Sequence, residues 1–111
     1  MFFTDKATQI EKFTKKKNST KLVSLLTDKD KDVRVQVIMA LGAIGDEAAI
    51  NNLISLLGDS DPVIRAAVAT SMGEMSNQTA KTHLQHLMER ETDETVRKAI
   101  REALGKIPNK K

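Results

Sequence analysis

Three arginines recur in this 111-residue sequence, each a few residues after a pair of acidic residues. A guanidinium offers five donors in a planar fork, which suits either an anion-binding site or a bridge to carboxylates. Because acidic residues precede every arginine, we expect structural bridges between each arginine and the turn acids of its own or the adjacent repeat. The arginines are Arg34, Arg65 and Arg97, and the acids are Asp28 and Asp30, Asp59 and Asp61, and Glu91 and Asp93.

Two histidines, His83 and His86, lie three residues apart, a spacing that would let both bind one metal ion from a helix. There is no third histidine and no nearby glutamate at a matching inward position, so we expect both side chains to face solvent. The sequence also lacks cysteine and tyrosine, and it places no serine in a suitable arrangement with a histidine and an acid. It therefore predicts no catalytic, metal-binding or cofactor-binding residues.

The densest basic run is Lys15 to Lys17, with Lys12 and Lys21 beside it. Such a run can bind nucleic acid or an anionic surface, but at a helix end it also complements the negative end of the helix dipole. Solvated lysines are the simpler interpretation, and we adopt it.

Composition makes nucleic acid an unfavoured partner. All three aromatic residues lie within the first 13 positions, so the remaining chain has no rings on which bases could stack. The net charge of +3 is arranged as basic ends around an acidic middle, residues 46–76, whereas a duplex-binding protein has a continuous basic stripe. The early polar residues do not fit a secretory signal, and no apolar run suits a membrane span. We expect a cytoplasmic protein with no membrane partner.

The sequence repeats itself. A shift of 31 residues aligns Leu22 with Leu53 and Leu84, and one extra residue enters before the third arginine. Other matching columns are Val33, Ile64 and Val96; Val37, Val68 and Ile100; and Gly42, Gly73 and Gly105. Glycine inside a helix costs about 1 kcal/mol relative to alanine, so three glycines at one phase predict that helices cross closely there.

Each copy contains two helical patterns joined by a turn. Leu53, Leu56 and Leu57 recur at i, i+3 and i+4, and a second helical pattern follows the turn 58–62. Asp61 suits an N-cap, and Pro62 suits the first turn of a helix. Because neither helix can bury its apolar face alone, the copies must stack.

The predicted fold is an all-α superhelix, or solenoid, of about three helix-turn-helix repeats in one domain, 1–111. The repeats are residues 18–45, 46–76 and 77–108. A capping helix is expected within residues 1–17, and its packed stripe would be Phe3, Ala7, Ile10 and Phe13 or Thr14.

The pattern Leu-x-x-Leu-Leu, an acidic turn, Val-Arg and Ala-Leu-Gly-x-Ile-Gly-Asp runs from Leu22 to Asp46. It resembles the HEAT repeats of the short subtype found in phycobilin-lyase-like proteins, and the resemblance covers about residues 18–108. The resemblance implies an armadillo-like helical array. It implies no single function, because such repeats serve scaffolds, chaperone-like binders, chromophore lyases and DNA-repair proteins. The related di-iron hydroxylases carry repeated His-Glu pairs, which this sequence lacks.

Second helices of such arrays usually line a concave face, so their solvent-facing positions are the candidate partner-binding residues. These are apolar in the first repeat, small in the second and charged in the third: Val35, Ile38 and Met39; Ala66, Ala69 and Thr70; and Lys98, Arg101 and Glu102. We expect the capping helix to cover part of the first group through Phe3, Ile10 and Phe13. The small residues would then form the floor of a groove.

These features favour a non-enzymatic scaffold or adaptor that binds another protein through the concave face, as a monomer or weak homo-oligomer. The resemblance offers an alternative, a phycobilin-lyase-like protein or a chaperone for a cofactor-bearing protein, although members of that family are usually longer. Nucleic-acid binding similar to that of HEAT-like DNA glycosylases is the least favoured, because the aromatic residues that those enzymes use are missing here.

Overall fold

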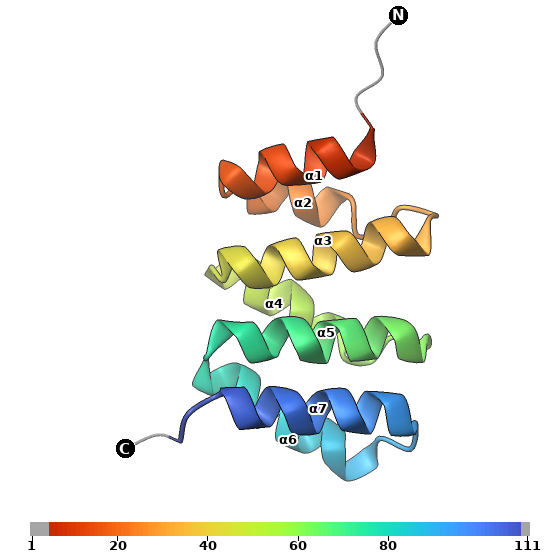
Figure 1. The fold of residues 1–111 in the computed structure, drawn as a ribbon, viewed down its shortest axis with the longest axis vertical. Helices are drawn as coiled ribbons and strands as arrows, with labels where there is room; N and C mark the ends of the chain where they lie inside the picture. The colour runs from red at the N-terminus through yellow and green to blue at the C-terminus, as the bar shows by residue number, and fades with distance from the viewer. Residues whose placement is uncertain (1–4, 110–111) are drawn as a thin grey trace, which may run out of the picture.

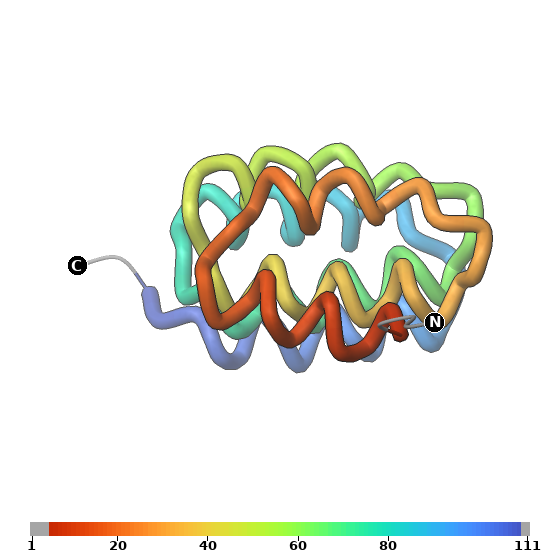
Figure 2. The backbone as a smooth tube through the Cα atoms, turned by 90° about the horizontal axis from the view of Figure 1, so that it is seen from above, coloured from red at the N-terminus to blue at the C-terminus, as the bar shows by residue number. Residues whose placement is uncertain are grey.

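The computed structural model describes residues 5–109, and this range forms seven α-helices and no strand. The helices are α1 (Lys6–Lys15), α2 (Ser19–Ser24), α3 (Lys31–Ile44), α4 (Glu47–Leu56), α5 (Pro62–Met75), α6 (Gln78–Arg90) and α7 (Glu94–Lys106). They stack along one direction (Figure 1) in two layers, with α1, α3, α5 and α7 in one layer and α2, α4 and α6 in the other (Figure 2). This is the predicted all-α solenoid.

Every one of these helices starts next to a side chain that caps it. An Asp or Asn precedes the first residue of each helix, and its carboxylate or amide oxygen accepts a backbone N–H of the first turn. At the other end of α3, Gly45 adopts a left-handed conformation with φ 65°. Ser76, at the equivalent position after α5, adopts a similar one with φ 50°. Short-range sequence chemistry therefore sets where the helices begin and how the chain turns.

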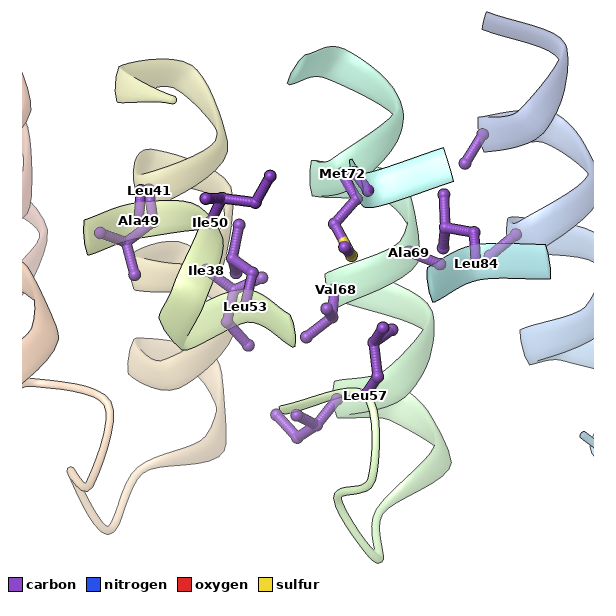
Figure 3. Close-up of a cluster of buried hydrophobic side chains, with 14 of the residues drawn as sticks. Ile38, Leu41, Ala49, Ile50, Leu53, Leu57, Val68, Ala69, Met72 and Leu84 are labelled. Atoms are coloured by element: carbon purple, nitrogen blue, oxygen red, sulfur yellow. The ribbon is translucent and has the colours of Figure 1, made fainter. Parts of the chain in front are cut away.

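The core lies between the two layers and continues through the stack. Leu22, Leu53 and Leu84, from the first helix of each repeat, are fully buried. Figure 3 shows buried side chains of α3, α4, α5 and α6 gathered in one cluster, among them Ile38 of α3 and Val68 of α5. Because side chains from neighbouring repeats share this core, no repeat is complete without the next one.

The glycine column marks close crossings between second helices, as predicted, at two of its three positions. A Cβ added at Gly42 would lie 2.0 Å from the Ser71 hydroxyl oxygen, and one added at Gly73 would lie 2.9 Å from the Ala103 Cα. The buried Ser71 hydroxyl donates a hydrogen bond to the Ile38 carbonyl at 2.7 Å, across the same crossing. Gly105 differs, because no described atom outside its own chain neighbourhood lies within 4 Å of its Cβ position.

Helix α1 lies in the layer of second helices and packs against α3. Its Ile10 is buried and Phe13 is half-buried, as expected for a helix that covers the first repeat. The prediction that Ala7 belongs to the packed stripe is wrong, because Ala7 is exposed. Helix α1 meets its neighbour through side chains one turn further along. Phe3 lies outside the described residues.

Candidate binding surface on the second helices

A second helix inside this stack is covered on three sides, by the first helix of its own repeat and by the second helices of the two adjacent repeats. Only a narrow stripe reaches solvent. We call this stripe on α3, α5 and α7 the second-helix surface, and it consists of Asp32, Gln36, Met39, Ala43, Val63, Ala67, Thr70, Glu74, Thr95, Glu102 and Lys106. Val63 is a solvent-exposed apolar side chain of this surface, with 49% of its surface exposed.

Two of the predicted binding residues do not belong to this surface. Ile38 and Ala69 are both 0% exposed, so the expectation that they face solvent is wrong. Each lies one helical turn before a glycine of the crossing column, on the side that packs against the next repeat. The helical phase separates the main apolar face from the rest, but it does not reveal that neighbouring repeats cover two further sides.

The other predicted residues are reached by solvent to different extents. Val35 and Ala66 are half-buried beside the same inter-repeat contact, whereas Thr70 is exposed and Met39 is partly exposed. In the third repeat the charged residues are all exposed: Lys98, Arg101 and Glu102. Arg101 holds the position of Ile38 and Ala69, and it is exposed because no described helix covers that side of α7.

A shallow groove runs between α5 and α7 on this surface. Its volume is about 310 Å³, and it is lined by Thr70, Ala99, Glu102, Ala103 and Lys106. The two alanines are buried and form an apolar floor. Lys106 Nζ donates to a carboxylate oxygen of Glu74 at 2.6 Å, and this hydrogen bond raises the pKa of Lys106. The groove can therefore accept a small apolar side chain beside charged groups.

The arginine column braces the turns mainly through backbone carbonyl oxygens, and among the predicted carboxylates Arg65 binds Glu91 of the adjacent repeat. In each repeat Nη1 donates to the main-chain carbonyl oxygen of the residue six positions earlier, with distances of 2.8 Å for Arg34, 2.8 Å for Arg65 and 2.9 Å for Arg97. The pairing predicted with Asp30, Asp61 and Asp93 is wrong, because these side chains instead cap α3, α5 and α7. A cap lies at the helix start, where its oxygen meets the free N–H groups of the first turn.

Arg65 also binds the turn of the next repeat. Its Nε and Nη2 donate to the two carboxylate oxygens of Glu91 at 2.8 and 3.0 Å. The two side chains are only 17% and 3% exposed. The bidentate hydrogen bond lowers the pKa of Glu91 and raises that of Arg65. Since all three guanidinium nitrogens donate within the protein, Arg65 is not available as an anion site.

Ion pairs link other repeats along the same edge of the stack. Lys6 pairs with Asp28, and Lys31 Nζ lies 3.0 Å from a carboxylate oxygen of Asp61. Hydrogen bonds from these lysines lower the pKa of both aspartates. Sequence reasoning missed these contacts. The sequence pattern that could have indicated these ion pairs is a lysine near the start of one helix and an aspartate in the turn of the following repeat.

The remaining candidates lie elsewhere. His86 is exposed and His83 half-buried on α6, in the other layer. The described residues contain no group of three or more potential metal ligands. The run Lys15 to Lys17 is exposed at the end of α1, the end of the stack opposite α7.

Stacked helical hairpins with a shared core define an α-solenoid, a class of protein built from repeats. A family model described as HEAT repeats matches residues 19–105, and the chain belongs to this family. No curated protein matches the sequence. HEAT repeats commonly mediate interactions between proteins. Within the described range, no helix combines the length and the apolar character that crossing a bilayer requires.

Proposed function

We propose that this protein is a non-enzymatic cytoplasmic adaptor that binds another protein through the second-helix surface. The observation that carries the proposal is the uncharged centre of that surface on α3 and α5. Met39, Ala43, Val63, Ala67 and Thr70 are exposed or partly exposed there. A connected region of small and apolar side chains is a typical feature of a protein-binding site.

The groove between α5 and α7 supplies a place for an anchor. In protein interfaces a few desolvated side chains that fill pockets contribute most of the binding free energy. The apolar floor formed by Ala99 and Ala103 suits an aliphatic side chain of the partner. Glu102 and Lys106 at the rim suit polar groups that flank it, because rim charges mainly orient a partner.

Replacement of Thr70 by Arg tests this proposal, because residue 70 is exposed and lines the groove. Binding partners are first isolated on the immobilised protein from the source cell and identified by mass spectrometry. Titration calorimetry with the purified partner then compares wild type, Thr70→Arg and Met39→Glu. We expect each variant to weaken binding by at least about tenfold while circular dichroism stays unchanged.

The matched control is His86→Glu, an exposed change on α6 in the other layer. We expect wild-type affinity from this variant. Unchanged binding by both Thr70→Arg and Met39→Glu, or loss of binding by the α6 variant, would show that the partner uses a different surface.

The resemblance to phycobilin-lyase-like repeats supports a second candidate, a chaperone for a cofactor-bearing protein. This candidate requires affinity for a bilin or for a bilin-carrying protein. The absorption spectrum of a free bilin mixed with the protein distinguishes the two functions. A shifted and intensified visible band would favour the second candidate, and an unchanged spectrum would favour the adaptor.

A further inference from the structure

The outer side of α7 has the position of an inter-repeat face but not its composition. In α3 and α5 this side packs against the next second helix. The corresponding residues are Ala66, Ala69, Thr70 and Gly73 in α5, and Lys98, Arg101, Glu102 and Gly105 in α7. All four α7 residues are exposed. We call these four α7 residues the end face.

Gly105 retains the feature that allows helices to approach closely. At the equivalent glycines, Gly42 and Gly73, the next second helix lies so close that an added Cβ atom would collide with it. Around Gly105 nothing among the described residues lies within 4 Å of the Cβ position. Glycine costs about 1 kcal/mol relative to alanine in a helix, and no contact within the described chain accounts for it here.

The charges of the end face are only partly neutralised. Arg101 Nη2 donates to a Glu94 carboxylate oxygen at 2.8 Å. Lys98 and Glu102, one turn apart on the same helix, form no ion pair within residues 5–109. Besides the pair Arg101–Glu94, the end face thus presents Lys98 and Glu102 to solvent, a cation and an anion separated along the helix axis. Glu102 lies at the edge of this face, because it also lines the groove between α5 and α7.

This arrangement is complementary to itself when two such helices pack antiparallel. With position 100 at the midpoint of the register, Lys98 lies opposite Glu102 of the partner subunit, and Glu102 lies opposite Lys98 of the partner subunit. The same register places Gly105 opposite the partner's Thr95, a small residue. It also brings Arg101 close to the partner's Arg101, where each guanidinium keeps the Glu94 of its own chain as counter-ion. Isologous contact of this kind, in which residue i meets residue j and j meets i, is the rule for twofold dimers.

We infer that a second copy of this chain docks on the end face, with α7 antiparallel to α7 of the partner subunit. The contact continues the established stack, because one more second helix takes the place next to α7. The twofold axis leaves each layer aligned with the same layer of the partner, so the two second-helix surfaces face the same side.

The opposite end of the stack does not offer the same contact. Residues 6–17 hold five lysines and one glutamate, and Lys12, Lys15 and Lys16 are exposed. Two such ends would bring like charges together, and so would this end against Lys98 and Arg101. The charges therefore favour pairing of one end face with another over pairing of an end face with α1.

Charge reversal tests the pairing directly. Sedimentation velocity is measured from about 10 µM to about 1 mM protein, where small polar interfaces dissociate. We expect the wild type to dimerise over this range, and more weakly as NaCl rises, because exposed ion pairs are screened. We expect Lys98→Glu alone and Glu102→Lys alone to weaken dimerisation by at least about tenfold, since each opposes like charges.

An equimolar mixture of the two variants is the decisive sample. The glutamate introduced into one variant then faces the lysine introduced into the other, and the second pair consists of the native Glu102 and the native Lys98. We expect the mixture to dimerise about as well as the wild type. A wild type that stays monomeric throughout, or a mixture no better than its components, would overturn the inference.

Gly105→Gln gives an independent check, because Cβ at residue 105 meets no described atom in the single chain. Circular dichroism is expected to be unchanged, while the larger side chain blocks the approach of the second α7. Dimerisation by this variant at wild-type strength would place the contact elsewhere. Titration calorimetry of Lys98→Glu and Gly105→Gln with the adaptor's partner keeps this result separate from the proposed function, because neither residue lines the groove.

Discussion

Among single residues, Arg65 makes the strongest contact between repeats, because it holds the nearly buried Glu91 through two hydrogen bonds. Arg65→Ala would leave that carboxylate without its partner in a poorly solvated site. We expect this variant to lose about 1–3 kcal/mol of unfolding free energy in urea titrations. Arg34→Ala removes a hydrogen bond to a carbonyl oxygen only, and Arg101→Ala removes an exposed ion pair, so we expect smaller losses. Equal losses in all three would contradict a special role for Arg65.

The same pair makes stability depend on pH. Arg65 lowers the pKa of Glu91 in the folded protein. The stabilisation is therefore present above the pKa of an unfolded glutamate, about 4.3, and is lost as the pH falls through the lower folded value. We expect the stability difference between wild type and Glu91→Gln to be largest near neutral pH and to shrink below about pH 4. Thermal melts of both proteins across this range provide the measurement, and a constant difference would exclude this role of Glu91.

At the scale of helices, the glycine column separates positions that look identical in the sequence. A methyl group at Gly42 or Gly73 would collide with backbone atoms of the next second helix. We expect Gly42→Ala and Gly73→Ala to destabilise the protein by about 1–3 kcal/mol through overpacking. Gly105 has free space, so Gly105→Ala should stabilise the helix by up to about 1 kcal/mol. Chemical denaturation of the three variants at low protein concentration compares them, and destabilisation by the third would contradict the geometry of α7.

For the whole molecule, stability must vary along the stack because each repeat contacts only its neighbours. Helix α5 packs between α3 and α7, whereas α1 contacts one described helix of its own layer, α3, and buries a single residue, Ile10. We expect the amide protons of α5 to exchange at least about tenfold more slowly than those of α1. Hydrogen exchange followed by mass spectrometry or NMR measures the gradient. Uniform protection would mean that the array opens only as one unit.

Much of this architecture follows from the sequence by itself. The repeat period, the pairing of helices and the turns between them depend on the spacing of residues close together in the chain. Asp61 caps a helix and Pro62 begins it for reasons that involve a single turn. The glycine column could be interpreted as a close crossing of helices, because glycine lowers helix stability relative to alanine and yet occurs at the same position in every repeat.

The tertiary structure alone decided which sides of each helix stay open and which charges meet. The helical repeat places Ile38, Ala69 and Arg101 at the same angle around their helix axes. It does not reveal whether another helix packs against that side. The next repeat buries the first two, and no described helix covers the third. Likewise, Arg65 had acidic residues in its own turn and in the next, and the stacking of repeats brought Glu91 to it. Periodicity determines direction around a helix axis, whereas exposure and pairing depend on the neighbour that occupies that direction.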